Sequence, residues 1–139
     1  MIEIRKAAQS DIDYCCQNPI EESIKSYPAL TLKDYALTGL VDGKIIGTGG
    51  VVILWESVGE GWIILTKDVN EYKTEAILCI RKLMNQAIKE LKLRRLQMIA
   101  RTDFPKAQKL AKTLGFQCEG CMKNYLPDGS DCFLYARVI

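Results

Sequence analysis

The sequence predicts an α/β domain with a mixed, mostly antiparallel twisted sheet and flanking helices. Short strand-like segments separated by turn signals run through the chain, and two amphipathic helical segments interrupt them in its second half. The chain has 139 residues, of which 48% are hydrophobic and 26% charged, which suits one core and is too short for two ordinary domains. A single domain covering residues 1–139 is therefore expected.

The N-terminal segment predicts a strand followed by a helix and an irregular stretch. Ile2 and Ile4 alternate with charged residues, as in a half-buried strand, and Ser10 is expected to cap a helix with an acidic first turn. Between residues 18 and 31, two prolines bracket charged residues. This pattern favours one short helix and a loop lying over a binding cleft.

A β-hairpin is expected next, because Asp42-Gly43 separates two strand-like segments, residues 35–41 and 44–54. Gly47, Gly49 and Gly50 indicate a bulge or a close approach of backbones within the second of these strands. The chain is then expected to turn over residues 56–61.

The middle of the chain predicts a central strand, a long helix and another strand. Residues 62–65 are apolar without alternation, as expected for a strand covered on both faces. From Thr74 to Leu91, apolar residues recur at helical spacing over about five turns of 3.6 residues. Leu96 begins the next strand, which is expected to reach Arg101.

The C-terminal segment predicts a helix that leads into a terminal hairpin. Residues 106–114 place apolar and lysine side chains on opposite sides of a helix, and Gly115 supplies its left-handed C-terminal residue. Pro127-Asp128-Gly129 forms the tight turn between two final strands, the second of which contains Phe133 and Tyr135.

This last segment resembles the C-terminal half of the GCN5-related N-acetyltransferase (GNAT) family. The resemblance is carried by Ala107 in the helix, by Gly115-Phe116 at its end, and by the two strands that follow. The closing segment, with Tyr125, Pro127-Asp128-Gly129 and residues 134–138, also resembles the small acetyltransferase-like proteins of tailed bacteriophages. The resemblance covers nearly the whole chain and implies the acyl-CoA N-acyltransferase fold, acetyl-CoA as co-substrate and an amine acceptor.

In this family the cofactor enters a gap between the fourth and fifth strands. Its pantetheine arm pairs with the fourth strand, and its pyrophosphate binds the following loop at the start of a helix. The resemblance therefore implies cofactor contacts from the strand, the loop and the next helix, namely Ile63, Ile64, Leu65, Thr66, Asn70, Tyr72, Lys73, Thr74, Phe104 and Lys109.

Two departures from the family bear on activity. The loop from Val69 to Thr74 lacks the family's glycines and carries Glu71, so an ordinary loop capping a helix is an alternative interpretation. The family's cofactor-contacting Asn falls on Phe104, and its usual proton-donating Tyr falls on Ala111. The usual general acid is therefore missing.

Three residues are the candidates for proton transfer. Glu60 and Glu56 are the candidate bases, and Tyr125 is the candidate acid. Each has a structural alternative, because carboxylates beside turns are usually solvated and a strand Tyr usually packs in the core.

Histidine is absent, which excludes serine and cysteine triads, histidine acid–base chemistry and the commonest zinc ligand. The six cysteines are expected to be reduced and free of metal, since Cys15 and Cys16 are adjacent and no secretion signal is evident. Cys118 and Cys121 are expected on opposite faces of a strand, which disfavours a zinc or thiol-redox site.

Charge and hydropathy narrow the partners. The formal net charge of +2 is too balanced to favour nucleic acid, although local basic clusters leave phosphate binding open. No apolar run is long enough to span a membrane, so a cytoplasmic protein is expected, in the host cytoplasm if a phage encodes it.

The sequence therefore favours an N-acetyltransferase that acts on an amine of a small molecule or protein. The alternative is a GNAT-fold interaction protein without cofactor turnover. A thiol or zinc protein is a weaker third hypothesis. Monomer and homodimer both remain open.

Overall fold

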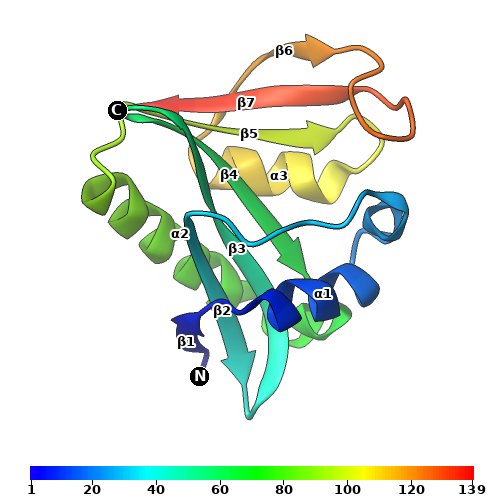
Figure 1. Ribbon diagram of the computed structural model, residues 1–139, viewed down its shortest axis with the longest axis vertical. Coiled ribbons are helices and arrows are strands. Elements are labelled where there is room, and N and C mark those ends of the chain that lie inside the picture. The colour runs from blue at the N-terminus through cyan, green and yellow to red at the C-terminus, as the bar shows by residue number, and fades with distance from the viewer.

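The computed structural model describes residues 1–139 and contains a seven-stranded sheet in the order β1-β2-β3-β4-β5-β7-β6 (Figure 1). Only β4 and β5 are parallel, and all other neighbours are antiparallel. The predicted mixed, mostly antiparallel sheet is confirmed. Its strands are β1 (Glu3–Lys6), β2 (Tyr35–Val41), β3 (Lys44–Trp55), β4 (Val58–Leu65), β5 (Arg95–Arg101), β6 (Gln117–Met122) and β7 (Cys132–Val138).

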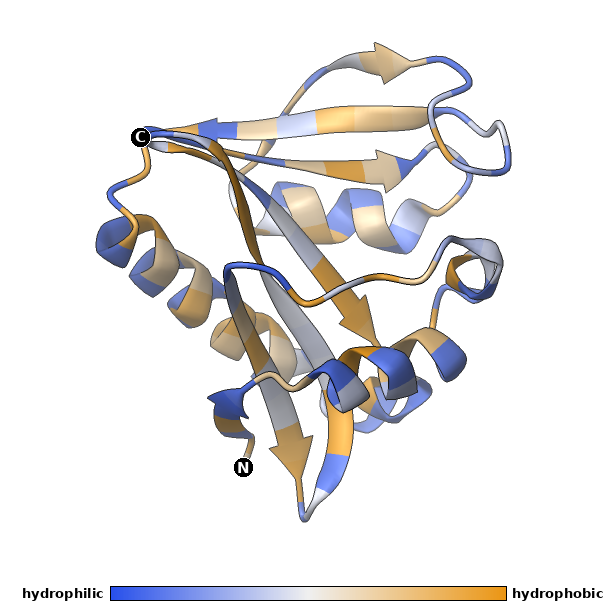
Figure 2. Ribbon diagram, in the orientation of Figure 1, coloured by the Kyte–Doolittle hydropathy of each residue, from blue (hydrophilic) through white to orange (hydrophobic).

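Helices cover both faces of the sheet (Figure 1). They are α1 (Gln9–Gln17), α2 (Lys73–Glu90) and α3 (Pro105–Thr113), with short 3₁₀ helices η1 (Glu22–Ser26) and η2 (Lys67–Glu71). α1 packs on β3 and β4, while the main core joins α2 and α3 to the other face, around Leu96, Ala111 and Tyr135. Hydrophobic and hydrophilic residues alternate around α2, as its predicted amphipathic pattern requires (Figure 2). None of the helices has the length and apolar character needed to cross a membrane.

Two predicted boundaries are wrong. Ser10 lies inside α1. The N-cap is Ala8, and its amide donates a hydrogen bond of 2.8 Å to the carboxylate of Asp11, the third residue of the helix. β4 begins at Val58 rather than Trp62, because Ser57 adopts a φ of 66° and lets the chain turn within two residues.

The predicted hairpin of β2 and β3 is confirmed, and the glycines of β3 mark close backbone contacts. A Cβ atom on Gly47 would lie 2.7 Å from Leu65 Cδ2, and one on Gly49 would lie 2.9 Å from the Trp62 carbonyl oxygen. β3 therefore approaches β4 too closely for side chains at these positions.

The prediction that Cys118 and Cys121 point to opposite faces is wrong. Cys118 pairs with Tyr135 and Cys121 with Phe133, and these two aromatic residues share one face of β7, with ring centroids 6.3 Å apart. A bulge before Gly120 adds one residue to β6 and so shifts its alternation. No group of three metal-binding side chains forms around them, and all six thiols are free: Cys15, Cys16, Cys79, Cys118, Cys121 and Cys132.

Candidate functional site

β4 and β5 diverge after a short parallel ladder. Their register contains three pairs, of which Glu60 with Gln97 is the last. The remainder of β4, through Leu65, has no partner in β5, and the two strands separate in Figure 1. The predicted splay between residues 62–65 and 96–101 is confirmed, and we call this gap the V.

Part of the β4 backbone faces the V without a strand partner. The Thr66 amide donates to the Ile46 carbonyl at 3.0 Å, so by alternation the polar groups of Ile64 and Thr66 face β3. Those of Ile63 and Leu65 face the V. They form an edge with which an extended chain bearing amide groups can pair.

An irregular segment, residues 19–27, crosses the open end of the V, and we call it the strap. At one end, the Ile20 amide donates to the Leu65 carbonyl at 2.8 Å, next to an isolated bridge between Pro19 and Thr66. At the other end, the Tyr27 hydroxyl accepts a hydrogen bond of 3.1 Å from Arg101 Nη1 at the end of β5. The predicted short helix is confirmed as η1, whereas the predicted binding cleft beneath it stays a prediction.

Glu60 lies where the V begins, half-buried and oriented by neighbouring strands. Gln97 Nε2 donates to Glu60 Oε1 at 3.0 Å, and Gln97 Oε1 accepts a hydrogen bond of 3.1 Å from Arg95 Nε. Arg95 also binds both carboxylate oxygens of Glu119, at 2.7 and 3.0 Å. This chain of hydrogen bonds fixes the carboxylate of Glu60 at the vertex.

The other two candidate catalytic residues lie farther away. Glu56 is exposed in the turn between β3 and β4, at the closed end of the ladder. Glu56 lies four positions before Glu60, on the far side of the turn at Ser57. Tyr125 is 54% exposed in the loop between β6 and β7, and its hydroxyl makes no hydrogen bond within the protein. The structure does not bring Glu56, Glu60 and Tyr125 together.

The start of α2 offers unpaired backbone donors. Its first intrahelical hydrogen bond runs from the Ala76 amide to the Tyr72 carbonyl, at 2.8 Å, and no side chain caps the helix. The amides of Lys73, Thr74 and Glu75 therefore remain free, and such amides attract anions.

The segment from α2 to α3 is basic overall, but the charge beside the free amides is mixed. Residues 73–115 hold eleven Lys and Arg but only three Asp and Glu, although the chain as a whole carries a net charge of only +2. Lys73 is exposed beside the free amides, and exposed Asn70 lies in η2 just before them. Glu71 and Glu75 oppose this charge locally. The free amides and Lys73 are donors of the kind that a pyrophosphate group binds, although the loop before them has no glycine.

No protein-family model matches the chain, and no curated protein matches its sequence. Solved structures do match it over its whole length. A GNAT-family acetyltransferase from Streptococcus pneumoniae has a TM-score of 0.74 at 18% identity, covering 100% of this chain and 99% of that one. Ard1 from Thermoplasma volcanium has a TM-score of 0.76 at 15% identity, with 99% and 97% covered. A mutant of the spermidine N-acetyltransferase SpeG from Vibrio cholerae has a TM-score of 0.76 at 16% identity, with 99% and 93% covered.

The chain has the GNAT fold. The other residues that were expected to contact cofactor in this fold occupy different environments. Ile64 is 3% exposed and Thr66 1% exposed, and Thr66 Oγ1 donates to the Ile45 carbonyl at 3.1 Å. Tyr72 packs against the small core cluster around Val69. These side chains support the GNAT scaffold rather than facing the V.

The third helix of this GNAT fold presents two further predicted contacts. Phe104 is half-buried at the N-cap of α3, and Lys109 is exposed along that helix. Ala111, where the family has its Tyr, is fully buried in the core. A tyrosine at this position would need space that the packed core does not provide.

Sequence reasoning missed Glu21 and Arg101, which lie at the open end of the V. Burial raises the pKa of the Glu21 carboxyl above its ordinary value, and the nearby positive charge of Arg101 partly opposes that shift. Arg101 is 9% exposed. The charged residues between the two prolines were visible in the sequence, but nothing in the pattern indicated their tertiary partners.

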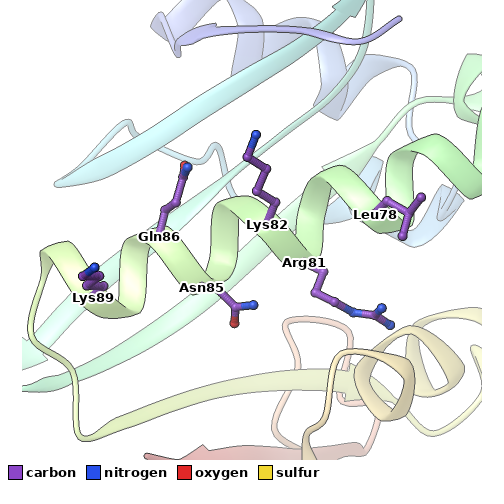
Figure 3. Close-up of a pocket in the computed structure, with 6 residues that line it drawn as sticks. All are labelled: Leu78, Arg81, Lys82, Asn85, Gln86 and Lys89. Carbon is purple, nitrogen blue, oxygen red and sulfur yellow. The ribbon is translucent and has the colours of Figure 1, made fainter.

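A shallow, open hollow lies elsewhere in the GNAT fold, along the outer side of α2 (Figure 3). It has a volume of about 460 Å³, and its side chains project outward from one helix: Leu78, Arg81, Lys82, Asn85, Gln86 and Lys89. Arg81 Nη2 donates to the Thr113 carbonyl at 3.0 Å, so part of this polar surface joins α2 to α3. None of these residues faces the V.

Proposed function

We propose that this protein is an N-acetyltransferase that transfers the acetyl group of acetyl-CoA to an amine. One observation carries the proposal: the V begins immediately after Glu60, so a half-buried, oriented carboxylate lies at the start of an unpaired strand edge. A thioester bound along that edge and a carboxylate at its end are the two elements that amine acylation requires. The likeness to solved GNAT structures supports the scaffold.

In this proposal, the β4 strand edge and the start of α2 hold the co-substrate. The backbone groups of Ile63 and the amide of Leu65 pair with the pantetheine arm, while the Leu65 carbonyl stays bound to Ile20. Lys73 and the free amides at the start of α2 hold the pyrophosphate. Phe104 and Lys109 contact the cofactor from α3.

The reaction forms a C–N bond to the acceptor and breaks the thioester C–S bond. An amine is protonated at neutral pH, with a pKa of about 10, so it must lose a proton before it attacks. Glu60 accepts that proton, directly or through a water molecule. Because Tyr125 does not lie beside Glu60, it returns a proton to the departing thiolate through water. Positioning of the two substrates supplies a large share of the rate enhancement.

One set of observations favours the second candidate, a GNAT-fold interaction protein without turnover. The loop that precedes α2 contains a 3₁₀ helix and Glu71 instead of glycines, and the strap already occupies the Leu65 carbonyl. Both features narrow the space for a cofactor. The six free thiols suit a reducing compartment, so the cytoplasm is the proposed location for either function.

Binding and turnover separate these candidates. We expect CoA at millimolar concentration to raise the melting temperature and to give a binding heat in calorimetry. Turnover is then measured by mass spectrometry of polyamine, lysine, peptide and small-amine acceptors incubated with acetyl-CoA. Thiol-reactive dyes are unsuitable because Cys118 and Cys121 are exposed. Absence of both a binding heat and a thermal shift contradicts the transferase and favours the interaction protein.

A further inference from the structure

Arg101 forms the densest side-chain hydrogen-bond cluster at the V. Its guanidinium makes five hydrogen bonds, all between 2.8 and 3.1 Å, to Asp103, Tyr27, Asp128 and Ser130. The side chain is 10% exposed, so these bonds are largely shielded from water. A planar guanidinium can satisfy four partners at once, which a lysine ammonium cannot do in this geometry.

The partners of Arg101 belong to different parts of the chain. Asp103 follows β5 directly, whereas Asp128 and Ser130 belong to the loop between β6 and β7. Tyr27 alone comes from the strap, 74 residues away in sequence. The bond from Arg101 to Tyr27 is therefore the link between the strap and the β5 side of the V.

The strap is fixed on the β4 side by separate contacts. Ile20 binds the Leu65 carbonyl, and Glu22 forms an ion pair of 2.9 Å with Lys67 just beyond β4. With Tyr27 attached to Arg101, the strap spans the open end of the V from one strand to the other. Glu21 lies between these two attachments, partly buried and close to the charge of Arg101.

We propose that Arg101 is a positioning residue that anchors the strap across the open end of the V, so that the strap and Glu21 form one wall of the acceptor site. This inference rests on the proposed function, because it assigns the acceptor, rather than acetyl-CoA, to the strap side. Arg101 itself touches neither substrate. It acts through Tyr27.

The test removes one hydroxyl. Tyr27→Phe deletes the bond to Arg101 and leaves the other four hydrogen bonds of the guanidinium in place. We expect a roughly tenfold rise in the KM of the acceptor, the size typical of losing one hydrogen bond to a charged group, with kcat and CoA affinity changed less than about twofold. Arg101→Lys should give the same or a larger rise, and Arg101→Ala the largest.

Tyr14→Phe is the matched control. Tyr14 lies on α1, is 39% exposed, and its hydroxyl makes no hydrogen bond within the protein, so the same chemical change there should leave the KM of the acceptor unaltered. A general loss of structure is detected separately, since it would lower the melting temperature and change CoA affinity together with KM.

Amide hydrogen exchange provides a readout that needs no activity. In Tyr27→Phe the Ile20 amide should exchange roughly tenfold faster than in the wild type, while core amides such as that of Leu96 keep their rates. If the Ile20 amide exchanges faster in Tyr27→Phe but the wild-type protein acetylates no amine, Arg101 still anchors the strap, and only the proposed transferase activity is refuted. An unchanged Ile20 rate, or an unchanged acceptor KM in an active enzyme, would overturn the role of Arg101.

Discussion

The V divides the molecule into two arms: the N-terminal arm holds β1 to β4 with α1, and the C-terminal arm holds β5, β6 and β7. Each arm buries one charged side chain, and the two charged side chains join different parts of the structure. In the N-terminal arm, Asp11 is 3% exposed and accepts hydrogen bonds from Arg5 at 2.6 and 2.9 Å, from the Ala8 amide at 2.8 Å and from Thr38 at 3.0 Å. In the C-terminal arm, Arg101 donates to residues of three separate loops. Both charges are fully paired, as buried charges must be.

The difference lies in what each charge joins. Asp11 joins α1 to β1 and β2, elements that are already packed together, so its network contributes to the stability of a finished layer. Arg101 joins irregular segments at the edge of the V, namely the strap and the loops that follow β5 and β6. Asp11 therefore stabilises a packed layer, whereas Arg101, in the role proposed above, positions the strap at the V.

Loss of Asp11 should have the largest effect on stability. We expect Asp11→Ala to lower the free energy of unfolding by about 3 kcal/mol, because the Thr38 hydroxyl and the Ala8 amide lose their acceptor and the α1 cap is lost. Denaturant unfolding measures this. Asp13→Ala, an exposed change in the same helix, should cost less than about 0.5 kcal/mol. Equal losses in the two variants would contradict the role of the buried network.

The pH dependence of stability should depend on the same carboxylate. The hydrogen bond from Arg5 is the main reason why the pKa of Asp11 lies below its ordinary value of 3.8. A carboxyl group with a depressed folded-state pKa contributes fully above pH 3.8, and its contribution is lost as the pH falls through the folded-state value. The stability gap between wild type and Asp11→Ala should therefore be constant from pH 7 to pH 5 and shrink in more acidic solution.

Substitution of Glu60 tests whether this carboxylate of the N-terminal arm removes the proton from the acceptor amine. In the proposed transferase, Glu60→Gln should lower kcat by about a hundredfold at neutral pH with little change in CoA affinity, since only proton removal is lost. Glu56→Gln is the matched control at the closed end of the ladder and should change kcat less than about twofold. If Glu56→Gln has the larger effect, the vertex of the V is not the site of proton transfer.

Local sequence signals predicted the elements of both arms. Asp42-Gly43 fixed the hairpin of β2 and β3, and Gly115, with a φ of 90°, ends α3 as expected. The splay of β4 and β5 also followed, but from the family resemblance rather than from residues alone. Contacts at the V were less predictable, because the bond between Tyr27 and Arg101 joins residues 74 positions apart.

Two errors show where local rules fail. The β6 bulge places Cys118 and Cys121 on the same face of the strand. Gly120 is the one residue in this part of the sequence that indicates a bulge. The N-cap of α1 is Ala8 rather than Ser10, because the Asp11 carboxylate that is bound to Arg5 and Thr38 also accepts a hydrogen bond from the Ala8 amide. In both cases tertiary pairing decides between local alternatives.

Substitution of Lys73 tests whether the start of α2 holds the co-substrate. Lys73→Glu reverses a charge beside the free amides of α2 and should weaken CoA binding roughly fivefold, with a smaller thermal shift at a given CoA concentration. Calorimetry measures the affinity. Lys33→Glu, an exposed residue before β2, makes the same charge change away from α2 and should leave the affinity within about twofold. Equal weakening in both variants would indicate a nonspecific effect of net charge.

Tyr125 should show the smallest effect, and it probes the C-terminal side of the V. Its hydroxyl is exposed and has no partner in the protein, so Tyr125→Phe removes nothing from the folded structure and should leave stability unchanged. If the hydroxyl protonates the departing thiolate, kcat should fall only about threefold, because water can reach this exposed position and supply the proton instead. A pH–rate profile of Tyr125→Phe that superimposes on the wild-type profile would remove Tyr125 from the mechanism and leave Glu60 as its single acid–base residue.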